Sequence, residues 1–122
     1  MKLTEANLER LEKERNIWLA TIRPAGRPHL VPVWFVYHQD QFYICINSGS
    51  VKGKNLGANP LASLSLEDGS KPLICEGKAE VVPEPWPQEI VDKFKLKYDW
   101  GIIEDKDYDQ LIRINPQKWP GW

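Results

Sequence analysis

One segment of the chain, residues 28–37, has the composition of a β-strand with apolar side chains on both faces. Alternate positions place Leu30, Trp34 and Val36 on one face and Val31, Val33 and Phe35 on the other. An antiparallel strand with one face in water alternates apolar with polar residues instead. We therefore expect one face to pack on a core and the other to meet a ligand or a second subunit. Pro32 cannot donate a hydrogen bond to a neighbouring strand, so it indicates a bulge or an unpaired edge position.

Other short segments with strand composition follow one another along the chain, separated by turn-forming residues. They are residues 17–22, 42–47, 62–67, 73–82 and 111–114. Apolar spacing or a capping residue predicts helices over residues 4–14, 51–58 and 88–98. This order predicts a mainly β fold, an antiparallel barrel with peripheral helices. We also expect Trp18 to lie in its core.

Length and composition exclude several classes of protein. With 122 residues the chain has room for one domain, which we expect to span 1–122. No apolar run approaches the roughly 20 residues of a membrane helix, and the first residues lack an apolar signal core. A net charge of −1 gives no general attraction to nucleic acid or membranes. Cys45 and Cys75 fit neither a disulfide framework nor a metal site, so we expect a cytoplasmic protein with reduced thiols and no metal.

The charged residues are unevenly distributed. From Asn16 to Leu66 the only acidic residue is Asp40, whereas four basic residues fall in the same stretch: Arg23, Arg27, Lys52 and Lys54. Such a stretch is suited to an anionic ligand. Buried strands also exclude charge of either sign, and this explanation of the missing acids stays open.

The segment 48–54 lies where a strand is expected to end and a helix to begin. The free amides at a helix start carry partial positive charge, which suits a phosphate. Ser48 and Ser50 add hydroxyl donors, and Lys52 and Lys54 add full positive charges. The sequence therefore predicts a phosphate site here, and the alternative is an ordinary capped helix with two solvated lysines.

A series of short motifs resembles the pyridoxamine 5'-phosphate oxidase-like split-barrel family. The motifs are Leu19-Ala20-Thr21-Ile22, Gly26-Arg27-Pro28-His29, Pro32-Val33-Trp34-Phe35, Ser48-Gly49-Ser50-Val51-Lys52, Asn59-Pro60, Ser63-Leu64-Ser65-Leu66 and Glu76-Gly77-Lys78-Ala79. The resemblance runs from about Ile17 to Val82. It implies a six-stranded antiparallel split barrel and a homodimer, with FMN or a deazaflavin relative in a groove between the subunits.

The resemblance also implies roles for individual residues. Ser50, Lys52 and Lys54 match positions at or near the cofactor phosphate. Positions that line the flavin, largely through backbone groups, match Thr21, Pro32, Val33, Trp34 and Asn47. Arg23 flanks the turn of a predicted hairpin, and its side chain either reaches a phosphate or only makes the hairpin more soluble. Trp34 and Trp119 are candidates to stack on a flat ring, and Trp100 is a candidate cover for the substrate side.

The sequence departs from the vitamin oxidases of this family at two positions. Val31 and Val51 are apolar where those enzymes carry basic residues, which argues against the vitamin oxidase activity. We expect a flavin-dependent oxidoreductase acting on an unidentified small molecule. The alternatives are a deazaflavin-dependent reductase and a non-catalytic flavin or haem carrier. No catalytic residue is identified, although His29 and His38 are possible proton donors; an oligonucleotide-binding barrel is disfavoured because the basic residues lie in loops.

Overall fold

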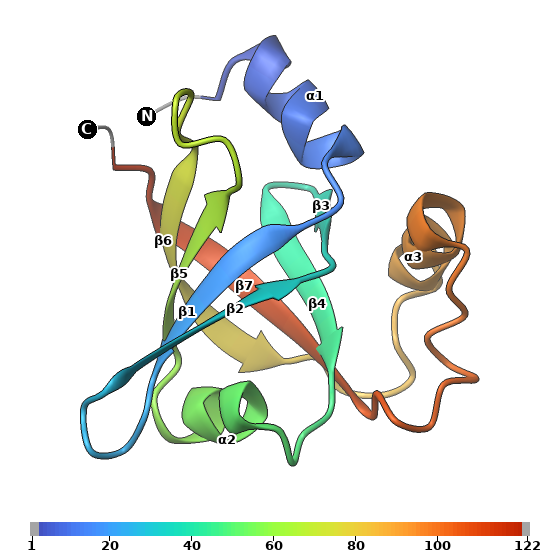
Figure 1. The fold of residues 1–122 in the computed structure, drawn as a ribbon. Helices are drawn as coiled ribbons and strands as arrows, with labels where there is room; N and C mark the ends of the chain where they lie inside the picture. Colours follow the sequence, from blue (N-terminus) through green and yellow to red (C-terminus); the bar gives the residue numbers. More distant parts are fainter. Residues whose placement is uncertain (1–2, 121–122) are drawn as a thin grey trace.

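Residues 3–120 are described by a computed structural model (Figure 1). A single sheet of seven antiparallel strands has the order β2-β1-β5-β6-β7-β4-β3. The elements in chain order are α1 (Glu5–Lys13), β1 (Ile17–Ile22), β2 (Pro28–Val33), β3 (Val36–His38), β4 (Gln41–Ile46), α2 (Val51–Ala58), β5 (Leu61–Leu66), β6 (Ile74–Val81), α3 (Gln88–Tyr98) and β7 (Gln110–Lys118). The mainly β fold with three helices is confirmed.

The expected number of six strands is wrong, because the segment 28–37 is divided into two strands. β2 ends at Val33 and β3 begins at Val36. Between them, the backbone N–H of Phe35 donates to the hydroxyl of Tyr98 at 2.9 Å, and that hydroxyl lies 2.9 Å from the Phe35 carbonyl oxygen. The Phe35 carbonyl also accepts from the Lys97 ammonium at 3.0 Å. Two side chains of α3 therefore take the hydrogen-bonding groups that a neighbouring strand would otherwise use. β2 and β3 follow one another in the chain but lie at opposite edges of the curled sheet.

The three helices lie close to their predicted bounds because the local sequence specifies their ends. α1 begins after Thr4, whose side chain accepts a hydrogen bond from the Asn7 backbone at 3.1 Å. Ser50 caps α2 in the same way. α3 begins after Pro87 and ends at Asp99, which has left-handed backbone geometry (φ 53°). No helix within residues 3–120 is long and apolar enough to cross a membrane.

Two groups of buried side chains cover the two faces of β4. Phe42, Ile44 and Ile46 point into the curled sheet, where Leu11 of α1 joins the same core. Tyr43 and Cys45 point outward into a second cluster beneath α3. β4 is therefore buried on both faces within one chain, and the helix that covers its outer face also reaches the break between β2 and β3.

The outer face of β1 and β2 is apolar and uncovered in the single chain, and Leu61 extends it at the start of β5, where Ser63 and Ser65 face the same way. Trp18, expected in the core, is 37% exposed because Ile17 and Leu19 take the inward positions of β1. Trp18 pairs with Pro32 across the strands, and Ala20 pairs with Leu30, which is 61% exposed. The edge position of β2 fits the prediction from Pro32.

Candidate functional site

A pocket of about 450 Å³ opens beside the break between β2 and β3. Its wall combines the end of β2 with residues from β4, from α2 and from the segment between α3 and β7. The lining residues are Asn16, Pro32, Val33, Trp34, Cys45, Lys52, Trp100, Asp105 and Tyr108. The pocket therefore gathers residues from β2 at one edge of the curled sheet and from β4, the strand next to the other edge.

Trp34 is held in this pocket by α3. Its ring stacks on Tyr98 with the centroids 4.5 Å apart and the planes 11° apart. The Tyr98 hydroxyl is fixed by Phe35 and lies 2.7 Å from the Arg15 carbonyl oxygen. Trp100 meets Trp34 edge-on at 5.7 Å. Trp34 remains 42% exposed, so a flat aromatic surface is presented at a defined place.

Lys52 contributes a positive charge to the pocket from the first turn of α2. The preceding cap is occupied, because the Ser50 hydroxyl accepts from the Gly53 N–H at 3.2 Å and donates to the Asn47 carbonyl at 2.6 Å. Lys54 is exposed and is not part of the pocket wall. The two lysines predicted together are thus separated by the turn of the helix.

Ser48 is bound by a carboxylate from a distant part of the chain. Its backbone N–H donates to Asp109 Oδ1 and its hydroxyl donates to Asp109 Oδ2, both at 2.8 Å. These hydrogen bonds lower the pKa of Asp109. The stretch around Ser48 is free of acids in the sequence, but it meets an acid in space. A carboxylate therefore lies against one of the groups that the sequence assigns to a phosphate.

Asn47 holds the loop before α2. Its side-chain amide donates to the Asp107 carbonyl at 2.8 Å, and its side-chain oxygen accepts from the Gly49 N–H at 2.8 Å. Gly53 packs so closely on this loop that a Cβ there would lie 2.7 Å from the Asn47 carbonyl oxygen. Asn47 is thus placed to shape the loop, outside the lining of the pocket.

The structure brings together four of the predicted site residues and leaves the others outside the pocket. Pro32, Val33, Trp34 and Lys52 line it. Thr21 is buried and its hydroxyl accepts from the Asn55 side chain at 3.0 Å, beside a second groove of about 380 Å³. Arg23 donates to the Pro28 carbonyl across the hairpin at 2.9 Å. Trp119 packs on Tyr37 and Phe42.

Four lining residues were missed by sequence reasoning: Asn16, Cys45, Asp105 and Tyr108. Asp105 accepts from the Trp100 indole N–H at 2.9 Å. The Cys45 thiol donates to the Tyr108 carbonyl at 3.5 Å, and burial raises its pKa to about 12. The sequence signal near Asp105 and Tyr108 is a dense run of acids after residue 103, and this run has no periodicity that would indicate a site.

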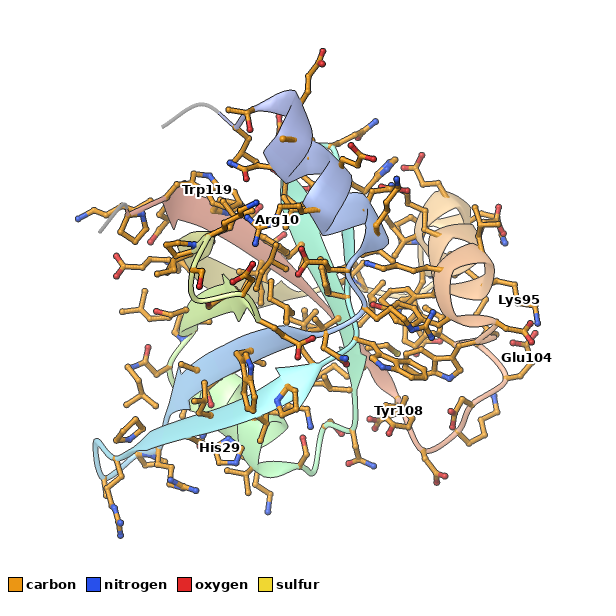
Figure 2. All side chains as sticks on the ribbon, turned by 45° about the horizontal axis from the view of Figure 1, so that its top comes forward. Arg10, His29, Lys95, Glu104, Tyr108 and Trp119 are labelled. Atoms are coloured by element: carbon orange, nitrogen blue, oxygen red, sulfur yellow. The ribbon has the colours of Figure 1, made fainter. Side chains whose placement is uncertain are left out.

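Neither histidine reaches the pocket. His29 pairs with Thr21 across β1 and β2. His38 ends β3, where its Nε2 lies 3.4 Å from a carboxylate oxygen of Glu89. Trp100, expected as a cover, does line the pocket. Figure 2 shows His29 near α2 and Tyr108 on the segment that leads into β7, so the two lie in different parts of the molecule.

Comparisons with known proteins agree with this architecture. The family model for pyridoxamine 5'-phosphate oxidase matches residues 3–122. No curated protein matches. The heme storage protein HutZ of Vibrio cholerae is 23% identical, with a TM-score of 0.77 over 97% of this chain and 92% of HutZ. An F420 reductase is 25% identical, with a TM-score of 0.77 over 97% of this chain and 98% of its own. A FAD-binding protein of Mesorhizobium loti is 20% identical, with a TM-score of 0.71 over 95% and 90%.

Proposed function

Because the chain belongs to the pyridoxamine 5'-phosphate oxidase family, we propose that it binds a flavin-type cofactor and acts as an oxidoreductase on a small molecule. The observation that carries the proposal is one pocket that holds both the exposed ring of Trp34 and the ammonium of Lys52. A flavin nucleotide needs a surface for a flat ring and a cation for its phosphate. When bound, the flavin supplies the hydride chemistry, and the protein supplies binding, orientation and exclusion of water.

The charge of Lys52 supports its assignment to the phosphate. Within residues 3–120 its ammonium forms no salt bridge, whereas Lys13, Lys93 and Lys95 each pair with a carboxylate. Lys54 and other lysines also form no salt bridge within residues 3–120. Lys52 differs from Lys54 because it lines the pocket near a helix start, where an anion is favoured.

Ser48 can contact the phosphate only if the Asp109 carboxylate moves away, because the phosphate and Asp109 would compete for the backbone N–H and the hydroxyl of Ser48. Ser50 acts through the helix cap that positions Lys52. We assign FMN as the cofactor on these grounds. The remaining residues that the sequence assigns to the cofactor lie outside the pocket, and they stay predicted contacts of a cofactor between two subunits. They are Thr21, Arg23, Asn47, Lys54 and Trp119.

A deazaflavin is the second candidate cofactor. The specific observation in its favour is the F420 reductase, which matches over 98% of its own chain and is 25% identical. F420 is a deazaflavin with the same tricyclic shape as a flavin, so Trp34 suits either ring.

Two valines argue against the vitamin oxidase activity. Val51, which is exposed at the start of α2, and Val31 on β2 lack the positive charge that the vitamin oxidases carry there. The vitamin phosphate is therefore not the substrate we assign.

A second copy of the chain is the partner we propose for the apolar outer face of β1 and β2, with Leu61 of β5 beside it. Leu30 and Leu61 are 61% and 48% exposed on it. Burying such a face in a homodimer removes apolar surface from water. The groove beside Thr21 lies against the same strands, so a dimer brings it toward a neighbouring subunit.

The absorption spectrum of the freshly purified protein tests the cofactor. We expect flavin bands, or their appearance when FMN is added to the colourless protein. Titrations with FMN, riboflavin, the deazaflavin coenzyme and haem then rank the candidates. Equal affinity for riboflavin and FMN would contradict the proposed phosphate site. Binding of haem alone would favour a non-catalytic haem carrier. A protein that takes up neither FMN nor the deazaflavin contradicts the proposed function.

A further inference from the structure

The pocket has a carboxylate in its wall as well as an ammonium. Among its nine lining residues, only Lys52 and Asp105 carry formal charge. Cys45 is a neutral thiol near pH 7, because burial raises its pKa to about 12. If the cofactor phosphate pairs with Lys52, Asp105 is left as the charge that a second ligand meets.

Asp105 is hydrogen-bonded to Trp100, whose ring contacts other aromatic rings edge to face. Trp100 lies 5.7 Å from Trp34 with the planes at 74°, and 5.0 Å from Tyr108 with the planes at 84°. The indole N–H of Trp100 donates to Asp105 Oδ2 at 2.9 Å, which ties the carboxylate to the rings. Asp105 Oδ1 accepts a second hydrogen bond, from the Asp107 backbone N–H at 3.2 Å. Each carboxylate oxygen still has a lone pair free for a further contact. Aromatic faces attract cations electrostatically, and a nearby carboxylate adds to this attraction.

This aromatic cluster already holds one cation of the protein itself. The guanidinium carbon of Arg15 lies 4.8 Å from the ring centroid of Tyr98 and 5.7 Å from that of Trp34. Arg15 is not among the residues that line the pocket, so the wall formed by Trp100, Asp105 and Tyr108 is left for a ligand.

We propose that this wall binds the second reactant as a planar cation, such as an aromatic ring with a positively charged nitrogen. The proposal deepens the proposed function and rests on it, since the cofactor phosphate is what neutralises Lys52. A flat ring can lie against the exposed surface of Tyr108, which is 40% exposed, and its charge is compensated by Asp105. Anionic reactants, phosphorylated ones included, are disfavoured by the negative charge of Asp105 in the pocket wall.

Two planar dyes of opposite charge test the proposal without any turnover. The oxidised protein, saturated with FMN, is titrated with the cation methylene blue and with the anion indigo trisulfonate, and the absorbance of the dye reports binding. We expect tighter binding of methylene blue. Asp105→Asn keeps the size of the side chain and an acceptor for Trp100, and it should weaken methylene blue binding about fivefold while strengthening that of the anion.

Asp107→Asn is the matched control, since it removes the same charge from the same segment without changing the pocket lining. An equal loss of methylene blue binding in both variants would indicate general attraction to an acidic surface and overturn the proposal. So would an unchanged preference between the dyes in Asp105→Asn.

A variant of opposite sign covers the case in which Asp105→Asn does not fold. In the cofactor-free protein, Lys52→Gln should strengthen methylene blue binding about fivefold, because it removes the competing positive charge; no change would count against the proposal. The FMN titration of the wild-type protein separates the two hypotheses. If the protein binds FMN but shows no preference between the dyes, only the cation site is contradicted. If it does not bind FMN, the proposed function is contradicted.

Discussion

Lys52 and Lys54 lie two positions apart on the same short helix, yet only Lys52 lines the pocket. We expect Lys52→Ala to weaken FMN binding by about 1.5–3 kcal/mol, the range for a hydrogen bond to a charged group. Fluorescence quenching of FMN measures the affinity. Riboflavin, which lacks the phosphate, should bind both proteins alike.

Lys54→Ala is the control for that change. It removes the same charge from the same helix at an exposed position outside the pocket, so the affinity for FMN should fall by less than about 1 kcal/mol. Equal losses in the two variants would show that the helix attracts the phosphate only through its overall charge.

The two cysteines should be unreactive in the folded protein. Burial raises the pKa of Cys45 and of Cys75 to about 12, so at pH 8 both remain thiols, and the thiolate is the reactive form. A thiol reagent should label neither residue at pH 8 in native protein and both after unfolding. Rapid labelling of native Cys45 would show that the pocket wall opens to solvent.

Residues far apart in sequence limit what could be predicted about the site. Short motifs that resemble the family predict four of the residues that line the pocket: Pro32, Val33, Trp34 and Lys52. Asp109 contacts Ser48 across 61 positions, and nothing local announces this contact. The predicted phosphate site was therefore described without the carboxylate that lies against it.

At the scale of elements, two glycines of α2 give opposite expectations. A Cβ at Gly53 would lie 2.7 Å from the Asn47 carbonyl oxygen and 2.8 Å from that of Ser48. Gly53→Ala should therefore destabilise the protein by about 1–3 kcal/mol. A Cβ at Gly57 would meet nothing within 4 Å, and Gly57→Ala should stabilise by about 0.5–1 kcal/mol through helix propensity. Urea unfolding measures both, and a shift of the same sign in the two variants would contradict the packing argument.

The elements themselves were largely predictable, with one exception. Capping residues and apolar spacing are local signals, and they placed α1, α2 and α3 within a residue or so of their bounds. The break between β2 and β3 depends on Tyr98, 63 positions beyond Phe35. The apolar run through Trp34 and Phe35 reads as one continuous strand, because the hydroxyl that interrupts it belongs to another element.

At the scale of the whole molecule, the apolar outer face of β1 and β2 predicts a dimer. Light scattering should give twice the chain mass of 14.1 kDa. Leu30→Lys places a charge on that face, where Leu30 is 61% exposed, and should yield the monomer. Leu96→Lys is the control, because Leu96 is 88% exposed on α3, and it should stay dimeric. A wild-type monomer at micromolar concentration would contradict the dimer.

The position of β2 and β3 at opposite edges of the sheet has a further consequence. Their two-residue link brings the edges together with little loop-closure entropy, yet backbone pairing between the edges is replaced there by Tyr98. The break between the two edges is thus closed by Tyr98 and Lys97 of α3, which both bond the Phe35 backbone. It borders the pocket, whose wall includes Pro32 on one edge strand and Cys45 on the strand next to the other. A ligand in the pocket would link the two edges of the sheet across this break. Amide hydrogen exchange in β2 and β3 should then slow in concert on ligand binding, while β5 and β6 in the middle of the sheet stay unchanged.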